Sequence, residues 1–106
     1  MNRKDFVNLN RLGEKHQTAH FAILLMQNGR GDTRLGITVS KRTGNSVTRN
    51  RVKRLIREFF RLHKALFPQG YDIVIAAKKD AGDLDFWKIK EELGDFVLDK
   101  KLHLSP

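Results

Sequence analysis

The fold is decided between Lys41 and Arg61, where the chain reads Lys-Arg-Thr-Gly-Asn-Ser-Val-Thr-Arg-Asn-Arg-Val-Lys-Arg-Leu-Ile-Arg-Glu-Phe-Phe-Arg. This stretch holds eight of the 21 Lys and Arg residues of the 106-residue chain and a single acid, Glu58. It therefore carries +7 of the formal net charge of +9. The positive charge is concentrated in one stretch rather than spread along the chain, so this stretch is expected to form a basic surface. Such a surface predicts contact with a polyanion.

The spacing of charged and apolar residues in this stretch predicts a two-faced helix. Asn45 or Ser46 can cap its first free amide groups. The helix is expected to run to about Leu66, because Pro68 and Gly70 follow. The apolar face carries Val52, Leu55, Ile56 and Phe59. The opposite face has the i, i+4, i+7, i+11 spacing of one stripe and carries Asn50, Arg54, Arg57 and Arg61, flanked by Arg49 and Lys53.

The charged face of this helix suits a nucleic acid. Neighbouring cations on one helix face lie about 5 to 6 Å apart, close to the spacing of phosphates along a strand. Arg grips a phosphate with two parallel donors, and Asn50 can offer its amide to a base edge or a 2′-hydroxyl. A merely solvated face would carry several acids among its cations. A membrane-surface helix would expose aromatic residues beside the charge, whereas here they lie opposite it.

The composition predicts a single domain over residues 1–106, with an ordered core of about 4–98. The chain has no cysteine, which excludes disulfides and thiolate metal sites and fits a reducing compartment. No apolar run follows Met1–Phe6, so a secretory signal is not expected. The longest apolar run, Phe21–Met26, is too short to span a membrane. These features predict a cytoplasmic protein.

Outside the basic helix, the hydrophobic periodicity predicts an α+β fold with one sheet and helices packed on it. Tyr71–Ala77 is a continuous apolar run of the kind that forms a strand buried on both faces. Residues 78–83 are expected to form a loop, and Asp85 to cap the last helix. In chain order, the expected elements are a helix at 5–12, strands at 15–18, 19–27 and 34–40, the basic helix, a strand at 71–77 and a closing helix from 86.

No pattern in the chain predicts catalytic chemistry of its own. The four histidines belong to no H-E-x-x-H zinc motif and are His16, His20, His63 and His103. Asp80, Asp83 and Asp85 could hold Mg²⁺ in a nuclease, or form a loop that ends in a helix cap. A major-groove reader usually has a second helix directly before its recognition helix, and here a strand is predicted there. The residues favour a binding protein and leave a stand-alone nucleic-acid-binding module and a metal-dependent nuclease as alternatives.

The basic helix is part of a longer sequence motif. Residues 36–58 read Gly-Ile-Thr-Val-Ser-Lys-Arg-Thr-Gly-Asn-Ser-Val-Thr-Arg-Asn-Arg-Val-Lys-Arg-Leu-Ile-Arg-Glu. This segment resembles the signature of the bacterial ribonuclease P protein family, whose hallmark is an Arg-Asn-Arg helix, here at 49–51. The flanks agree at Asp5-Phe6, at Arg34-Leu35-Gly36 and at residues 71–76, Tyr-Asp-Ile-Val-Ile-Ala. The resemblance covers about residues 4–98.

The resemblance implies a fold, a function and partners. The fold is like that of ribosomal protein S5 domain 2, with an uncommon left-handed β-α-β crossover made by the basic helix. The function is that of the RNA-binding protein subunit of ribonuclease P, an endoribonuclease that removes the 5′ leader from precursor tRNA. The chemistry is expected on a catalytic RNA with bound Mg²⁺, so this chain is expected to have no catalytic residue and no cofactor or metal of its own. The implied partners are that RNA and precursor tRNA, with no membrane and no obligate protein partner.

The resemblance also implies two binding surfaces. A cleft between the sheet and the first helix is implied to take the single-stranded leader, lined by Phe6 and Leu24, since aromatic stacking suits such a strand. Asn10 stands where the family usually has a second Phe, and Leu24 where it often has Tyr. Phe21 is expected in the core. The surface implied for the catalytic RNA comprises Lys41, Arg42, Arg49, Asn50, Arg51, Lys53, Arg54, Arg57 and Arg61.

Overall fold

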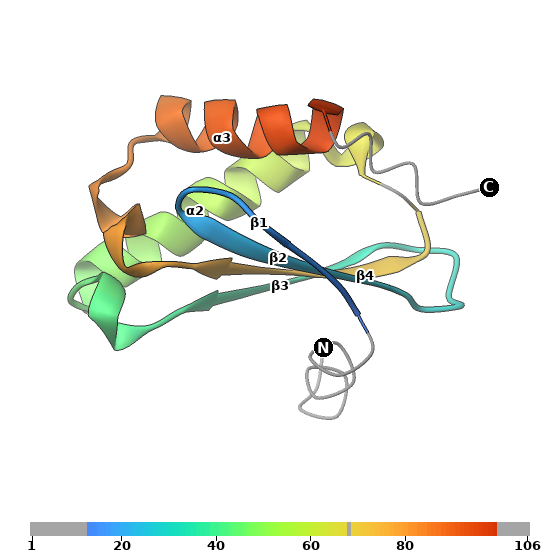
Figure 1. The fold of residues 1–106 in the computed structure, drawn as a ribbon, viewed down its shortest axis with the longest axis horizontal. Coiled ribbons are helices and arrows are strands. Elements are labelled where there is room, and N and C mark those ends of the chain that lie inside the picture. Colours follow the sequence, from blue (N-terminus) through green and yellow to red (C-terminus); the bar gives the residue numbers. More distant parts are fainter. Residues whose placement is uncertain (1–12, 68, 100–106) are drawn as a thin grey trace.

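The computed structural model describes residues 13–67 and 69–99, and within them the chain folds into one sheet covered by helices (Figure 1). The strands are β1 (Glu14–Gln17), β2 (Phe21–Gln27), β3 (Arg34–Val39) and β4 (Tyr71–Ala77). The α-helices are α2 (Ser46–Leu62) and α3 (Phe86–Asp99), and the 3₁₀ helices are η1 (Lys41–Thr43), η2 (Lys64–Leu66) and η3 (Lys79–Asp83). The α+β prediction is confirmed. The helix predicted at 5–12 lies outside the described residues.

The sheet has the strand order β1-β2-β4-β3. β2 is antiparallel to both β1 and β4, whereas β3 is parallel to β4. Parallel neighbours need a crossover connection, and α2 supplies it between β3 and β4. The register aligns Ile23 of β2 and Ile37 of β3 with Ile75 of β4. β4 therefore lies in the interior of the sheet, between β2 and β3, as its continuous apolar sequence predicts.

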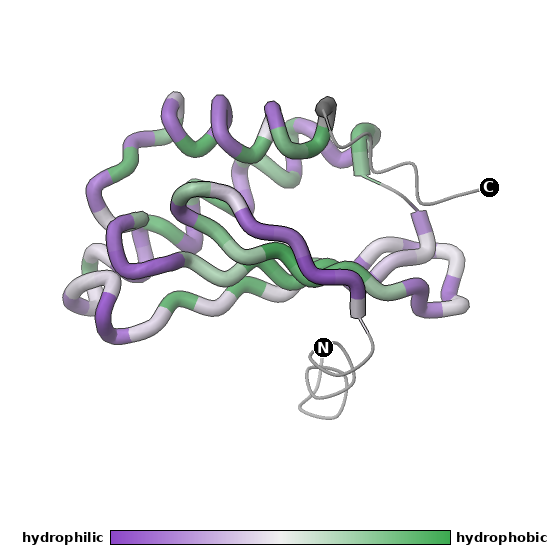
Figure 2. Tube along the Cα trace, viewed as in Figure 1, coloured by the Kyte–Doolittle hydropathy of each residue, from purple (hydrophilic) through white to green (hydrophobic). Residues whose placement is uncertain are grey.

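Both α-helices lie on the same face of the sheet (Figure 1). Alternate residues of β2 point to that face, where Phe21, Ile23 and Leu25 are at most 2% exposed. The apolar colouring in Figure 2 follows β4 and the helix sides that face it. Phe21 is thus in the core, as predicted. The helices contribute Val52, Ile56, Phe59, Ile89, Leu93, Phe96 and Val97 to the same cluster.

The basic helix ends earlier than its sequence predicts. α2 stops at Leu62 rather than at Leu66, because His63 leaves the helical conformation at φ −120° and ψ 26°. The 3₁₀ helix η2 follows and turns Phe67 back into the core. There its ring lies 6.2 Å from that of Phe59. Burial of this one aromatic side chain offsets the helical turn that is lost, since a fully buried Phe is worth about 1.5 to 3 kcal/mol. Residues 79–83, predicted as loop, likewise form the 3₁₀ helix η3.

A buried carboxylate joins three parts of the sheet. Asp72 in β4 is 2% exposed. Arg34 in β3 donates to it from Nε to Oδ1 at 2.7 Å and from Nη2 to Oδ2 at 2.5 Å. Asn28, in the turn after β2, donates from Nδ2 to Oδ1 at 3.0 Å. The hydrogen bonds from Arg34 lower the pKa of Asp72 below its ordinary 3.8, although burial acts in the opposite direction.

Replacing Asp72 with Ala should lower the free energy of unfolding by about 2 to 3 kcal/mol at neutral pH, because Arg34 and Asn28 lose a charged acceptor. Since folding lowers the pKa of Asp72, its contribution is present above the ordinary value and is lost as the pH falls through the folded value. Urea unfolding from pH 7 to about 2.5 should therefore show the variant approaching the wild type as the solution becomes acidic. Asp32→Ala removes an exposed pair with Arg30 and is the control, with little expected effect. A deficit for Asp72→Ala that does not change with pH would contradict this role of the ion pair.

Candidate nucleic-acid interface

The orientation of α2 about its own axis is fixed by three buried side chains. Val52, Ile56 and Phe59 are at most 1% exposed and belong to the main core. At the start of the helix, Asn45 Oδ1 accepts a hydrogen bond from the backbone N–H of Thr48 at 2.9 Å. Asn45, rather than Ser46, is therefore the cap. With one face buried in this way, the charged face of α2 must point away from the sheet.

The charged face carries what we call the exposed stripe, defined as Asn50, Arg54, Arg57 and Arg61. All four residues are exposed, as their spacing predicts. Within the described chain, Arg54 and Arg57 form no ion pair. Arg61 donates to Glu58 from Nη2 to Oε1 at 2.5 Å and from Nε to Oε2 at 3.2 Å, and this contact lowers the pKa of Glu58. Solvent screens this pair, so it holds Arg61 only weakly.

The remaining predicted cations flank the stripe in different ways. Lys41 and Arg42 are exposed on η1, directly before the helix. Arg49 and Lys53 are half-buried on α2. The Nε of Arg49 is buried and has no hydrogen-bond partner in the described part of the chain. The basic surface thus extends from η1 along α2, and its exposed cations are Lys41, Arg42, Arg54, Arg57 and Arg61.

Arg51, the second arginine of the Arg-Asn-Arg segment, faces a different way from the stripe. Its guanidinium donates from Nη1 to the carbonyl of Leu84 at 2.9 Å and from Nη2 to the carbonyl of Gly82 at 2.5 Å. These two carbonyls lie at the end of η3 and just before α3. Arg51 therefore joins α2 to the start of α3, a contact that no local sequence pattern indicates. An RNA contact by its other donors stays a prediction.

The corner that Arg51 holds is closely packed. A Cβ atom added to Gly82 would lie 2.5 Å from the carbonyl oxygen of Thr43 in η1, so a side chain does not fit there. Thr43 itself donates from Oγ1 to the carbonyl of Lys78 at 3.4 Å. η1 and η3 thus touch through backbone atoms, and Arg51 closes the corner from α2.

The three aspartates of the acidic cluster lie on η3 and at the start of α3. Asp85 Oδ1 accepts from the backbone N–H of Lys88 at 2.9 Å and caps α3, as predicted. Asp80 and Asp83 are exposed on η3. Among the described residues, no three His, Cys, Asp or Glu side chains form a group that could hold a metal ion. Asp80, Asp83 and Asp85 therefore do not form the three-carboxylate group that the nuclease alternative invokes.

Two histidines and a glutamate make contacts that the sequence does not predict. The ring of His63 packs on Phe59 with centroids 4.8 Å apart. His20 Nδ1 lies 2.6 Å from Glu92 Oε1, and the backbone N–H of His20 donates to Glu92 Oε2 at 2.7 Å. Thr18 Oγ1 also donates to Glu92 Oε2. This cluster fastens the β1–β2 turn to α3.

Leu24, one of the two residues predicted to line the leader cleft, lies on the sheet face opposite to the one that α2 and α3 cover. Leu24 is half-buried there, because it alternates with the core residues Ile23 and Leu25. In the sheet register it stands between Lys15 of β1 and Val74 of β4. Phe6, the other residue predicted for this cleft, lies outside the described residues. Leu24 and the charged face of α2 therefore lie on opposite sides of the sheet.

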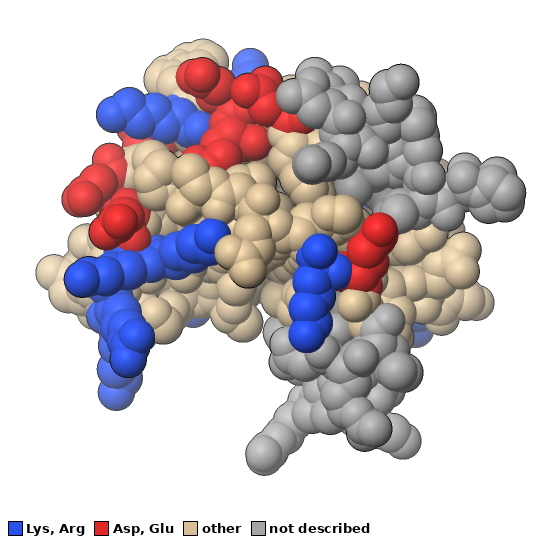
Figure 3. Space-filling view, viewed as in Figure 1, with Lys and Arg blue, Asp and Glu red and all other residues tan. Residues whose placement is uncertain are grey.

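The charges of the two helices differ in sign. In the face shown in Figure 3, acidic residues gather over α3. The outer turns of α3 carry Glu91 and Asp95, both exposed. A polyanion would therefore be attracted to α2 and repelled by the outer surface of α3.

Among the described residues, no helix has the length and apolar character needed to cross a membrane.

Comparison with known proteins gives the family. The family model described as Ribonuclease P matches residues 1–101. The Ribonuclease P protein component of Syntrophus aciditrophicus is 44% identical over 92 residues, which cover 87% of this chain and 77% of that protein. The corresponding protein of Geotalea uraniireducens is 42% identical over 103 residues, or 97% of this chain and 88% of the relative. The solved structure of the Staphylococcus aureus RNase P protein has a TM-score of 0.87 and 32% identity, covering 96% of this chain and 94% of that one.

Arg51→Met should lower the free energy of unfolding of the RNA-free protein by about 2 kcal/mol, because two charge-assisted hydrogen bonds to backbone carbonyls are lost. Arg54→Met is the matched control, since it removes the same group from the exposed stripe, and should change stability by less than about 0.5 kcal/mol. Urea unfolding followed by circular dichroism measures both. Equal stability of the two variants would show that Arg51 does not hold the corner.

Proposed function

The chain belongs to the ribonuclease P protein family, and we propose on that premise that α2 binds the catalytic RNA of ribonuclease P. Membership makes the chain a subunit of this ribonucleoprotein and gives it a part in tRNA processing. What is proposed beyond membership is that the charged face of α2 contacts the catalytic RNA. One observation carries it: Arg54 and Arg57 extend from α2 into solvent with no carboxylate paired to either in the described residues.

The chemistry of the exposed stripe favours RNA phosphates. Residues three and four apart on a helix have side chains about 5 to 6 Å apart, so successive cations can meet successive phosphates. Guanidinium groups bind phosphate with two parallel hydrogen bonds, which fixes orientation as well as position. Asn50, in the same row, can donate to a base edge or a 2′-hydroxyl and so prefer RNA to a plain polyanion.

In this proposal the cleavage chemistry belongs to the catalytic RNA and its Mg²⁺, and the protein supplies positioning. Removal of the 5′ leader requires two polyanions, the catalytic RNA and the precursor tRNA, to lie against each other. Cations from η1 and α2 offset the repulsion between them, so that less free Mg²⁺ is needed. No side chain of the chain has to donate or accept a proton in this account.

The leader is assigned to the other side of the sheet. We propose that the single-stranded 5′ leader lies against the face that carries Leu24, with Phe6 as a stacking partner. Leu24 is half-buried, so it offers apolar contact rather than a stacking ring. Opposite locations for the two RNAs suit a protein that holds substrate and catalyst together.

Reversing two charges of the stripe tests the proposal. Arg54→Glu with Arg57→Glu should weaken binding to a bacterial ribonuclease P RNA by at least about 100-fold, because phosphate attraction becomes repulsion. For the wild type, with roughly six to eight phosphate contacts, log affinity should fall with log salt at a slope of about −4 to −7. Filter binding across a salt series measures both quantities.

The control is a double reversal of equal charge on other elements, Lys79→Glu with Lys88→Glu, both exposed residues. It should retain most of the affinity. The same series with duplex DNA and with precursor tRNA separates the proposal from a stand-alone nucleic-acid-binding module, which would bind duplex DNA as tightly as the catalytic RNA. Unchanged affinity in the Arg54 and Arg57 double variant would reject α2 as the interface.

A further inference from the structure

The acidic residues of the chain are concentrated in one stretch, as its cations are, but on a different element. Residues 79–99, which cover η3 and α3, hold seven of the 12 Asp and Glu residues and only three Lys. In Figure 3, acidic side chains gather over α3. The net charge of +9 is therefore divided between a strongly basic α2 and a locally acidic α3. Each of these surfaces is electrostatically complementary to the other surface on a second copy of the chain.

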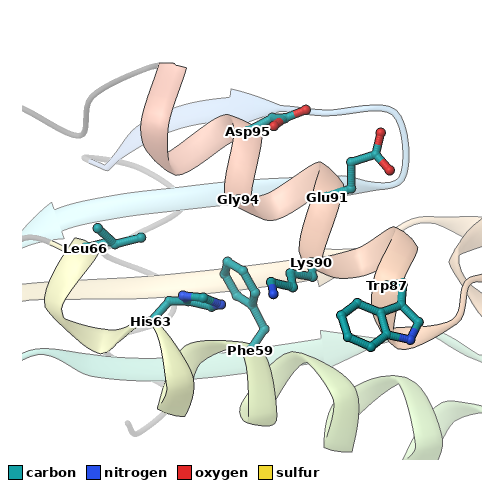
Figure 4. Close-up of a pocket in the computed structure, with 8 residues that line it drawn as sticks. All are labelled: Phe59, His63, Leu66, Trp87, Lys90, Glu91, Gly94 and Asp95. Carbon is teal, nitrogen blue, oxygen red and sulfur yellow. The ribbon is translucent and has the colours of Figure 1, made fainter.

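A pocket of about 320 Å³ opens beside these acids, between the second half of α2 and the first three turns of α3 (Figure 4). Its walls include Phe59, Leu66 and Trp87. Trp87 is 68% exposed, although aromatic rings of this size normally bury most of their surface. Leu66 is 43% exposed, and Leu62, at the end of α2, is 52% exposed. Exposed apolar groups gathered at one opening are typical of a protein-binding site.

The rim of this pocket is negatively charged. Glu91 and Asp95 belong to its lining, and both are exposed on α3. The one lysine of the lining, Lys90, has its Nζ 5.3 Å from the centroid of the Trp87 ring, so the π-face of the indole partly offsets its charge. An apolar pocket with two carboxylates at its rim suits a partner that brings an apolar side chain flanked by cations.

The charged face of α2 offers this combination of groups. Val47 stands in the same row as the exposed stripe, three residues before Asn50 and seven before Arg54, and is 76% exposed. Arg54 and Arg57 follow it with no carboxylate paired to either in the described residues. The stripe points away from the sheet, whereas the pocket lies on the side of α2 that faces α3. The two surfaces of one copy therefore cannot meet each other.

We propose that the RNA-free protein self-associates head to tail, with the charged face of α2 of one copy seated on the pocket of the next. Val47 enters the apolar opening beside Trp87, and the arginines of the stripe face the two carboxylates of the rim. A helix laid into an apolar groove is a common mode of recognition. Because the two surfaces differ, the contact is heterologous and can extend into short chains of copies. The catalytic RNA competes for the stripe, a consequence that rests on the proposed function, and so returns the protein to single copies.

Sedimentation velocity of the full-length, RNA-free protein tests this contact. Over about 10 µM to 1 mM protein, the sedimentation coefficient should rise at physiological salt, as expected for a weak interface. It should fall back at about 1 M salt, where charges are screened beyond about 3 Å. The emission of Trp87, the single tryptophan, should shift to shorter wavelength over the same range, and excess ribonuclease P RNA should reverse the shift. A monomer throughout the series would overturn the inference.

Two charge-reversed variants test the head-to-tail geometry. Arg54→Glu with Arg57→Glu reverses the stripe, and Glu91→Lys with Asp95→Lys reverses the rim. Each variant alone should self-associate at least about 10-fold more weakly than the wild type, because like charges then meet. Mixed in equal amounts, the two should associate again, since the second variant keeps an intact stripe and the first an intact pocket. Variants that remain monomeric on mixing would contradict a contact between these two surfaces.

The apolar part of the contact is tested separately from its charge. Trp87→Ala and Val47→Ser should each weaken self-association about 10- to 100-fold, because each removes a central apolar group. The matched control for the rim variant is Glu14→Lys with Asp80→Lys, an equal change of charge at exposed acids outside the pocket. It should self-associate within about 3-fold of the wild type. Wild-type self-association in Trp87→Ala would show that the pocket is not the docking site.

RNA binding separates this inference from the proposed function. The rim variant should bind ribonuclease P RNA at least as tightly as the wild type, because it loses only acids that repel RNA. If the stripe reversal abolishes RNA binding but the wild type is monomeric, the inference fails and the proposed function stands. If the stripe reversal abolishes self-association and leaves RNA affinity unchanged, the contact between copies stands and the proposed function fails. A monomeric wild type whose Trp87 emission responds to an arginine-rich peptide would overturn the inference and assign the pocket to a basic segment of another protein.

Discussion

The burial of Val52, Ile56 and Phe59 is the contact on which the rest of the structure depends. Each of these side chains is worth about 1.5 to 3 kcal/mol when fully buried, and together they admit a single orientation of α2 about its axis. That orientation decides which residues meet solvent. A rotation of α2 by one residue would carry the exposed stripe toward the sheet and bury unpaired charge, which is far more costly than lost packing. The core thus sets the direction of the basic surface.

The signature segment serves the fold as well as the interface. Asn50 is exposed on the stripe, whereas Arg51 next to it donates to two carbonyls near the start of α3. Side chains of successive helical residues point about 100° apart, so one short segment can place one side chain in solvent and the next against a neighbouring element. Beside this contact, Gly82 of η3 lies so close to the carbonyl oxygen of Thr43 in η1 that no side chain fits between them. One short segment therefore contributes both to the packing of α2 near the start of α3 and to the exposed stripe.

The hydrophobic periodicity of the sequence predicts the helices and strands, because burying one face of such an element requires apolar residues at regular spacing. The strand at Tyr71–Ala77 and the cap at Asp85 were read correctly from local sequence alone. The errors came from packing that local periodicity does not encode: α2 ends at Leu62 rather than at Leu66, and Phe67 turns back into the core. The sequence predicts Arg51 as one more cation of the basic helix, because no local pattern indicates that it donates to the carbonyls of Gly82 and Leu84.

The most direct test of the central role given to α2 is cleavage of a 5′-extended precursor tRNA by a bacterial ribonuclease P RNA at low millimolar Mg²⁺. The rate would be compared without protein, with the wild type and with the Arg54→Glu, Arg57→Glu variant. The account predicts strong stimulation by the wild type and its loss in the variant, with the two rates converging at high Mg²⁺, where the metal alone screens the phosphates. Equal stimulation by both proteins at low Mg²⁺ would contradict it.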